Sequence, residues 1–130
     1  MRYQGGFSLL EVMIAATVLS IGFSGLSLLS LQGIAATMAA RQQSEAVLLA
    51  SELDTLMRLA PGGFEQWQGE WRQRVAAALP HGTAVVCRDI TPDDGDAAAP
   101  DCDGDGPTVI KLFWRDAGSN EQRLGWVPSP

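Results

Sequence analysis

The densest group of side chains that could bind a ligand is an acidic segment, residues 91–107, rich in aspartate, proline and glycine. Within it, residues 101–106 have the sequence DCDGDG, with carboxylates at the first, third and fifth positions and glycine at the sixth. This spacing matches the first half of a calcium-binding EF-hand loop, in which alternate residues supply oxygens to the ion. The twelfth position, where a bidentate glutamate belongs, is Leu112, and no helices are predicted beside the loop.

Three carboxylates upstream, those of Asp93, Asp94 and Asp96, could complete a calcium site of another kind. The alternative is an acidic loop whose carboxylates simply face water. We expect this second arrangement, with no tight metal site, because half of the EF-hand pattern is missing.

Catalytic chemistry has little support in the sequence. The single histidine, His81, lies in Pro80-His81-Gly82, which predicts a turn. The sequence contains no nucleophile elbow, phosphate-binding loop or zinc-ligand spacing. We therefore predict a protein that is not an enzyme and that uses no cofactor.

A different kind of chemistry is indicated by Glu11, the only charged residue between Phe7 and Leu31. A helix over these residues would be about 37 Å long at ~1.5 Å per residue, enough to cross a bilayer. A charge in the middle of a membrane helix costs roughly 2.5–3.5 kcal/mol, so this carboxylate needs a partner. An ordinary secretory signal cut among residues 35–40 is the alternative, but a glutamate in its apolar core fits it poorly.

This apolar helix has two distinct faces. Small residues form one face, and hydroxyl residues form the opposite face. Both kinds of side chain let helices pack closely in lipid, although they could also be merely tolerated in an anchor. The first face holds Glu11, Ala15, Val18, Gly22, Gly25, Leu29, Ala36 and Ala40, and the second holds Thr17, Ser20, Ser24 and Ser27.

One long helix should run from Phe7 to Ala60, because no proline interrupts it before Pro61-Gly62-Gly63. After Gln32 the pattern is amphipathic, so this half should lie on a globular part, with Asp54 and Arg58 away from the buried stripe. The predicted stripe is Leu31, Ala35, Met38, Ala46, Leu49, Leu53, Leu56, Met57 and Ala60.

A second helix is predicted from Phe64 to Leu79, where apolar residues recur at helical spacing. We expect this row to form core, and a surface for a neighbouring subunit is the alternative. The row is Phe64, Trp67, Trp71, Val75 and Leu79.

Three strands should follow, over residues 83–90, 108–116 and 122–127, since β-branched and aromatic residues dominate the first two. Residues 117–120 predict a hairpin turn between the last two strands.

Cys87 and Cys102 lie in the part that a membrane helix would leave outside the cytoplasm, where two cysteines indicate one disulfide. Two free thiols are the alternative. At 130 residues there is room for one domain, and a net charge of -6 argues against nucleic-acid binding.

Residues 6–12, with the sequence GFSLLEV, resemble the start of the type IV pilins, a family that includes the pseudopilins of type II secretion. The resemblance implies that residues 1–6 are a leader, which a prepilin peptidase removes by cutting between Gly6 and Phe7. It also implies N-methylation of Phe7 and a role for Glu11 in subunit assembly. The implied fold is α+β and pilin-like, with a long N-terminal helix packed on a small antiparallel sheet and a disulfide near the C-terminus.

Residues 19–26 and 46–53 are similar to minor pilins in particular, with the sequences LSIGFSGL and AVLLASEL. The organisation implied is a transmembrane and assembly helix over residues 7–31 and a periplasmic globular part over residues 32–130. The implied partners are other minor pilins, the major pilin, the prepilin peptidase and the inner membrane. The alternatives are a minor pseudopilin of type II secretion and a membrane-anchored adhesin or DNA-uptake pilin, for which the acidic chain offers no basic groove.

Overall fold

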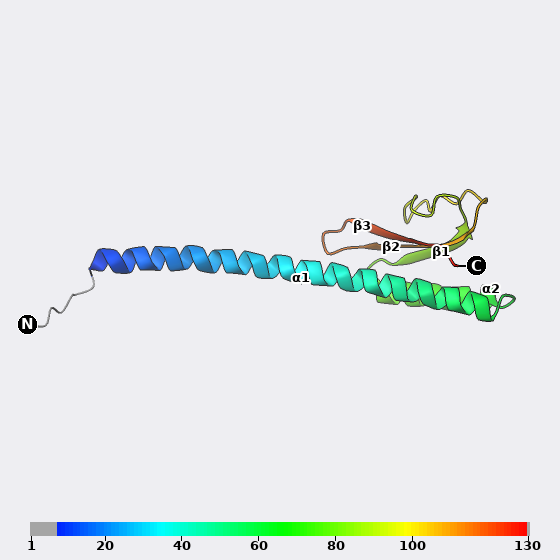
Figure 1. Ribbon diagram of the computed structural model, residues 1–130, viewed down its shortest axis with the longest axis horizontal. Coiled ribbons are helices and arrows are strands. Elements are labelled where there is room, and N and C mark those ends of the chain that lie inside the picture. The colour runs from blue at the N-terminus through cyan, green and yellow to red at the C-terminus, as the bar shows by residue number, and fades with distance from the viewer. Residues whose placement is uncertain (1–7, 130) are drawn as a thin grey trace, which may run out of the picture. The chain divides into compact units, whose positions relative to one another are not determined.

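The computed structural model describes residues 8–129, in which two helices are followed by three strands (Figure 1). The elements are α1 (Leu9–Leu59), α2 (Phe64–Ala78), β1 (Thr83–Arg88), β2 (Thr108–Arg115) and β3 (Glu121–Trp126). The long helix, the second helix and the three predicted strands are therefore confirmed, with ends that differ by a few residues. Phe7, the predicted first residue of the long helix, lies outside the described residues. The chain divides into two compact units between Thr37 and Met38.

The first unit, as far as it is described, is the N-terminal part of α1, and its apolar side chains are exposed. By length and composition α1 could cross a membrane, and none of its most apolar window is buried. The hydroxyls of the predicted polar face, and that of Ser30, donate to carbonyls three or four residues earlier, at 2.7–3.1 Å. These hydroxyls are thereby satisfied within the helix, which lowers the penalty for placing them in an apolar environment. They belong to Thr17, Ser20, Ser24, Ser27 and Ser30.

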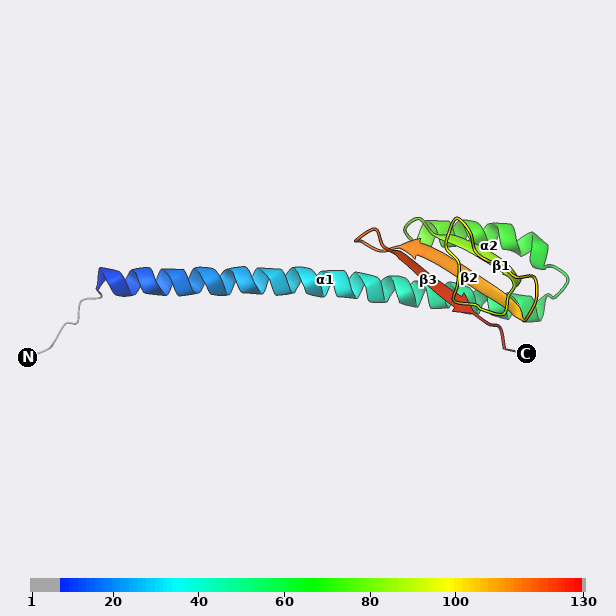
Figure 2. The ribbon, with the colours of Figure 1, turned by 90° about the horizontal axis from the view of Figure 1, so that it is seen from above.

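In the second unit, the end of α1 and the whole of α2 pack on one face of the sheet (Figure 2). Their contact is fixed by a buried hydrogen bond, in which the indole Nε1 of Trp71 donates to the carbonyl of Leu49 at 2.9 Å. The core combines α1, α2 and β2, which confirms that the second half of the long helix lies on a globular part. Its buried members are Ala46, Leu49, Ala50, Leu53, Trp71, Val75, Leu79, Ile110, Leu112 and Trp114.

The sheet has the order β1-β2-β3, and both pairings are antiparallel. β2 is central, and six of its eight residues are buried. Ile110, Leu112 and Trp114 belong to the core that includes the helices. The alternate residues Val109, Lys111 and Phe113 are as deeply buried, and successive side chains of a strand point to opposite faces. The second face of the sheet must therefore be covered as well.

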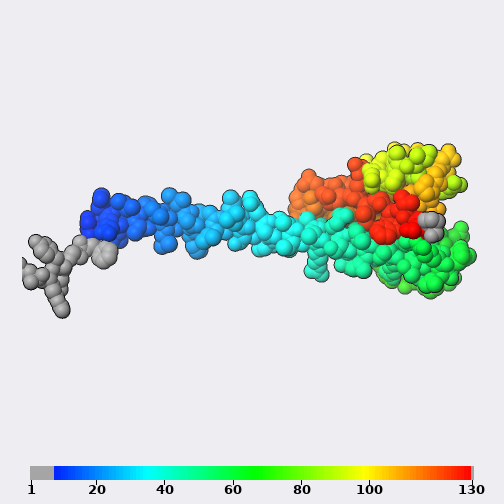
Figure 3. Space-filling view, in the orientation of Figure 1, coloured from blue at the N-terminus to red at the C-terminus, as the bar shows by residue number. Residues whose placement is uncertain are grey.

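That cover is the loop between β1 and β2, residues 89–107, which lies on the side of the sheet away from the helices (Figure 3). Its close approach is visible at Gly125 of β3, where an added Cβ would come within 2.3 Å of the carbonyl oxygen of Pro92. The predicted loop is thus present, and it covers one face of the sheet instead of extending into solvent.

The hairpin between β2 and β3 follows the predicted turn at residues 117–120. The carboxylate of Asp116 accepts the backbone N–H groups of Gly118 and Asn120, both at 2.9 Å. Ser119 has a φ of 63°, in the left-handed region that tight turns require. These bonds fix where β3 begins, and hence the register in which Lys111 pairs with Gly125.

Five predicted burial assignments are wrong. Two of them, Leu31 and Ala35, were placed on the buried stripe but are exposed in the first unit. Asp54, which was expected away from the buried stripe, is only 8% exposed, because Arg58 pairs with it and the indole of Trp126 reaches it. Trp67, expected in the core row of α2, is 46% exposed. Met38, at the start of the second unit, is 53% exposed although it was placed on the buried stripe, since the core of that unit begins only at Ala46.

Candidate functional site

Of the three predicted N-terminal site residues, Gly6 and Phe7 lie outside the described residues, and only Glu11 can be placed. It lies in the first turn of α1, with an exposed side chain. An acidic residue is favoured there because the helix N-terminus carries partial positive charge. Within residues 8–129, no ion pair to Glu11 is formed. The apolar part of its helix supplies no cation either, because the sequence has no Lys or Arg between Phe7 and Gln32.

The small-residue face of the same helix is open. A Cβ added at Gly22 or Gly25 would meet nothing within 4 Å. Neither glycine is therefore required for packing inside this chain.

The second candidate region is the acidic loop, which the predicted disulfide closes. Cys87 on β1 is bonded to Cys102, 15 residues further along the chain. Two arginines hold the loop from outside: Arg88 Nε donates to the carbonyl of Gly106 and an Nη atom of Arg123 to that of Gly95, each at 3.0 Å. Gly95 itself has a φ of 77°, and a Cβ there would meet the Pro100 carbonyl oxygen at 2.4 Å.

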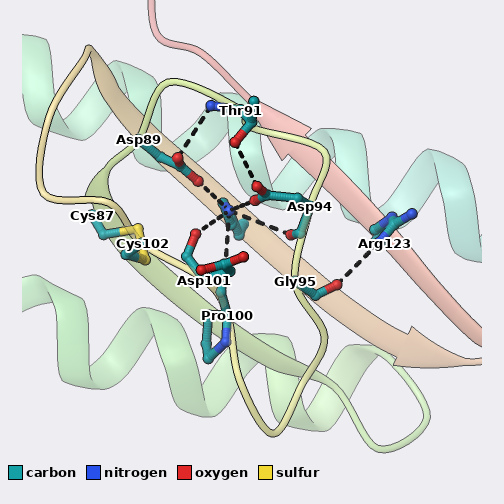
Figure 4. A network of polar contacts seen from close by, with 10 residues as sticks. Cys87, Asp89, Thr91, Asp94, Gly95, Pro100, Asp101, Cys102 and Arg123 are labelled. Atoms are coloured by element: carbon teal, nitrogen blue, oxygen red, sulfur yellow. Dashed lines mark hydrogen bonds and ion pairs between the residues drawn. A yellow bond between two sulfur atoms is a disulfide. The ribbon is translucent and has the colours of Figure 1, made fainter.

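Asp89, Asp94, Pro100 and Asp101 lie around a common centre in Figure 4, and all four contact the ammonium group of Lys111. It donates to the carbonyl oxygens of Pro100 at 2.9 Å and Asp101 at 3.0 Å, and to that of Asp94 at 3.3 Å. Its contact with the carboxylate of Asp94 is 2.5 Å, and it forms an ion pair with Asp89. Lys111 is 1% exposed and Asp89 is completely buried, so this pair lies inside the protein.

The charges in this group support one another. The contact with the ammonium group of Lys111 lowers the pKa of Asp89 from 3.8 to about 2, although burial acts in the opposite direction. Burial would lower the pKa of Lys111, but its bonds to Asp89 and Asp94 outweigh burial and raise that pKa. The pKa of Asp94 is lowered, mainly by Lys111 and by Thr91. Asp103 differs, because its hydrogen bond with Asp89 and the nearby negative charges raise its pKa.

The three carboxylates of the half EF-hand pattern do not converge on one point. Asp101 turns its backbone carbonyl to Lys111, and the side chains of Asp103 and Asp105 are exposed. In the part of the chain that the structure describes, no group of three or more His, Cys, Asp or Glu side chains could hold a metal ion. The sequence did contain a signal for the observed arrangement: Lys111 is the one charged residue in an otherwise apolar run, VIKLFW, next to an acidic loop.

A third polar group, at the end of α1, stabilises the fold. Asp54 accepts from Arg58 at 3.0 Å and from the indole of Trp126 at 3.4 Å, which connects α1 to β3. The bond from Arg58 lowers the pKa of Asp54.

His81 lies in the turn that was predicted for it, with a φ of 52°.

Comparison with known proteins gives one match. A family model of the prokaryotic N-terminal methylation motif matches residues 1–27, which include Gly6, Phe7 and Glu11. No curated protein and no solved structure matches the chain. The matched motif is joined here to a long apolar helix and a small antiparallel sheet with a disulfide, which is a pilin-like fold. The chain therefore carries a prokaryotic N-terminal methylation motif, which indicates a structural protein like the type IV pilins and pseudopilins.

Proposed function

We propose that this chain is a minor pilin, a structural subunit that joins other minor pilins in a priming or tip complex for assembly of the type IV pilus. The observation that carries the proposal is the methylation motif at residues 1–27, continued by a helix whose most apolar window is entirely unburied. An apolar surface of this kind needs either lipid or other helices around it. A subunit that moves from a membrane into a helical assembly is surrounded first by lipid and then by other helices.

Among minor pilins, we propose that the chain is of the PilV type. The support is the likeness of residues 6–12, 19–26 and 46–53 to that subunit. The major pilin would then be a further partner. The subunit would first span the inner membrane once, with the second unit in the periplasm, and would later be part of the pilus.

Maturation would begin with the prepilin peptidase, which cuts between Gly6 and Phe7 and leaves Phe7 to be N-methylated. The cut creates a new cation, the amine of Phe7, four residues before Glu11. We propose that in the assembly the Glu11 carboxylate meets the N-terminal amine of a neighbouring subunit. Since only one axial stagger of two helices neutralises both charges, this pair would set the register of assembly.

The experiment is co-purification from the inner membrane, followed by identification of the bound pilins. Each variant is expressed in place of the wild-type chromosomal gene. Glu11→Ala should leave leader cleavage and folding of the second unit intact but reduce recovery of the partners. Glu11→Asp should have a milder effect. Glu65→Ala is the matched control, because Glu65 is an exposed acidic residue in the first turn of α2. If Glu11→Ala recovered its partners and supported normal piliation, the proposed role of this carboxylate would be wrong.

A minor pseudopilin of type II secretion is the second candidate, because the methylation motif fits it equally well. The two functions differ in phenotype. Deletion of a minor pilin should impair pilus-dependent twitching and leave secretion intact, whereas deletion of a minor pseudopilin should have the opposite result.

A further inference from the structure

The environment of Lys111 is unusual for a lysine, because both its flanking residues and its depth are those of a core position. Ile110 and Leu112 on either side are fully buried, and Lys111 itself is 1% exposed. An ammonium group taken from water to such a place is strongly destabilising unless oxygens replace its hydration shell. The fold must therefore supply those oxygens.

It does so with five oxygens, all from residues 89–101. Three are backbone carbonyls, of Asp94, Pro100 and Asp101, and two are carboxylate oxygens, of Asp89 and Asp94. An ammonium has only three N–H donors, so five oxygens cannot each receive a separate, well-directed hydrogen bond. Carbonyl and carboxylate oxygens gathered around one centre are instead the ligand set that proteins use for hard cations such as Ca²⁺.

The loop has no other described cation at this position. Arg88 and Arg123 bind the carbonyls of Gly106 and Gly95 from the outside, through bonds at exposed positions. The carboxylates of Asp89 and Asp94 thus depend on Lys111 for their neutralisation within the described loop. Asp103 is a further carboxyl close to Asp89, whose proximity raises the pKa of Asp103.

We propose that Lys111 is the resident cation of this loop and occupies the position that a metal ion would otherwise take. Its ammonium holds residues 89–101 against β2, so the loop is ordered without any divalent cation. Removing the amine while leaving space for an ion converts the loop into a calcium-binding site. This inference is independent of the proposed assembly function, because it concerns only the second unit.

The test compares melting temperatures of detergent-purified full-length protein in excess EDTA and in calcium, followed by tryptophan fluorescence. The wild-type protein should melt at the same temperature in both. Lys111→Ala, which leaves room for an ion, should melt lower than wild type in EDTA and should be stabilised by calcium. With a Kd of about 1 mM, calcium at about 10 mM would raise its melting temperature by roughly 5–10 °C.

Two controls separate the cation site from general effects. Lys111→Met keeps a long apolar side chain in the same space, so it should be destabilised without recovering in calcium. Arg123→Ala removes a cation that contacts the loop from outside, and it should give no calcium response. If Lys111→Ala folds only when calcium is present, the purification itself supports the proposal.

Three results would overturn the proposal. One is a calcium or EDTA effect on the wild-type melting temperature, which would indicate a metal site that coexists with Lys111. Another is a Lys111→Ala protein that calcium neither folds nor stabilises. The third is an intact mass lower than expected by one water, since an amide between Lys111 and a neighbouring carboxyl would remove the positive charge.

Discussion

Replacing Cys102 by serine is the most direct test of how the loop between β1 and β2 is stabilised. The side chain of Cys102 is exposed, whereas Cys87 is half-buried on β1, so the Cys102 substitution disturbs the least packing. The loop next to Cys102 also has other attachments, since the carbonyls of Pro100 and Asp101 bind Lys111. We therefore expect the native fold to survive, and the effect to arise mainly in the unfolded chain.

The size of that effect follows from the loop that the disulfide closes. The two cysteines are 15 residues apart, and a loop of this length corresponds to about 3 kcal/mol in the loop-entropy model. For a unit of fewer than about a hundred residues, this free energy lowers the melting temperature by roughly 12–24 °C. It is a large part of the ~5–15 kcal/mol that stabilises a typical domain.

The assay is urea unfolding of the full-length protein in detergent, followed by tryptophan fluorescence. All four tryptophans lie in the second unit, so the signal reports on that unit alone. Wild-type protein in reductant should match Cys102→Ser in oxidant, because both lack the same cross-link. Equal stability of Cys102→Ser and oxidised wild type, within about 0.5 kcal/mol, would refute the loop-entropy reasoning. Two thiols labelled in unreduced, denatured protein would refute the disulfide itself.

Three further predictions concern other parts of the chain. Mass spectrometry of the mature protein should find an N-methylated chain that begins at Phe7, and a bulky residue in place of Gly6 should leave the precursor uncut; retention of Met1 or a start near Arg41 would contradict this. Stability should fall as the pH drops from about 4 towards 2, because the pKa of Asp89 is lowered from 3.8 to about 2 on folding. A lowered pKa stabilises the folded state in full above the ordinary value, and this stabilisation is lost as the pH falls to the folded value. Asp89→Asn should make the loss of stability with falling pH less steep. If Asp89→Asn left the dependence of stability on pH unchanged, the stabilising role of the Asp89–Lys111 ion pair would be contradicted. Trp71→Phe should lower the free energy of unfolding by about 1–3 kcal/mol, through loss of a buried hydrogen bond, whereas Trp67→Phe at an exposed position should change it by less than ~0.5 kcal/mol.

The elements of this fold could be predicted because local signals agree with one another. The long helix has no proline and ends near Pro61-Gly62-Gly63, and the first two strands are largely apolar runs bounded by turn residues. The disulfide could be predicted because two cysteines, both expected outside the cytoplasm, leave one pairing. None of these inferences needs knowledge of which elements meet in space.

The wrong assignment of Asp54 and the missed site depend on contacts between distant segments. Asp54 lies beside Leu53 at the edge of the buried stripe, and it is buried because Trp126, 72 residues away, reaches it. Helical periodicity alone contains no information about that indole. Likewise, the acidic pattern at residues 101–106 predicts side-chain oxygens around an ion. In the structure, Lys111 is bound mostly by backbone carbonyls, which any residue type can supply.

Glu11 and Lys111 pose the same physical problem, since each places a charge in apolar surroundings. For Lys111 the chain solves the problem by itself, because the loop over residues 89–101 brings five oxygens to the ammonium. For Glu11, the described residues form no ion pair, and the sequence between Phe7 and Gln32 contains no cationic side chain. A charge satisfied within the chain stabilises the subunit whether or not it is assembled. A carboxylate left without such a partner gains most from a cation on another molecule, so its free energy favours assembly over the isolated subunit. On this argument, Glu11→Ala should weaken assembly without changing the stability of the second unit. Lys111→Ala should lower the stability of the second unit without removing the charge pair that Glu11 makes in the assembly.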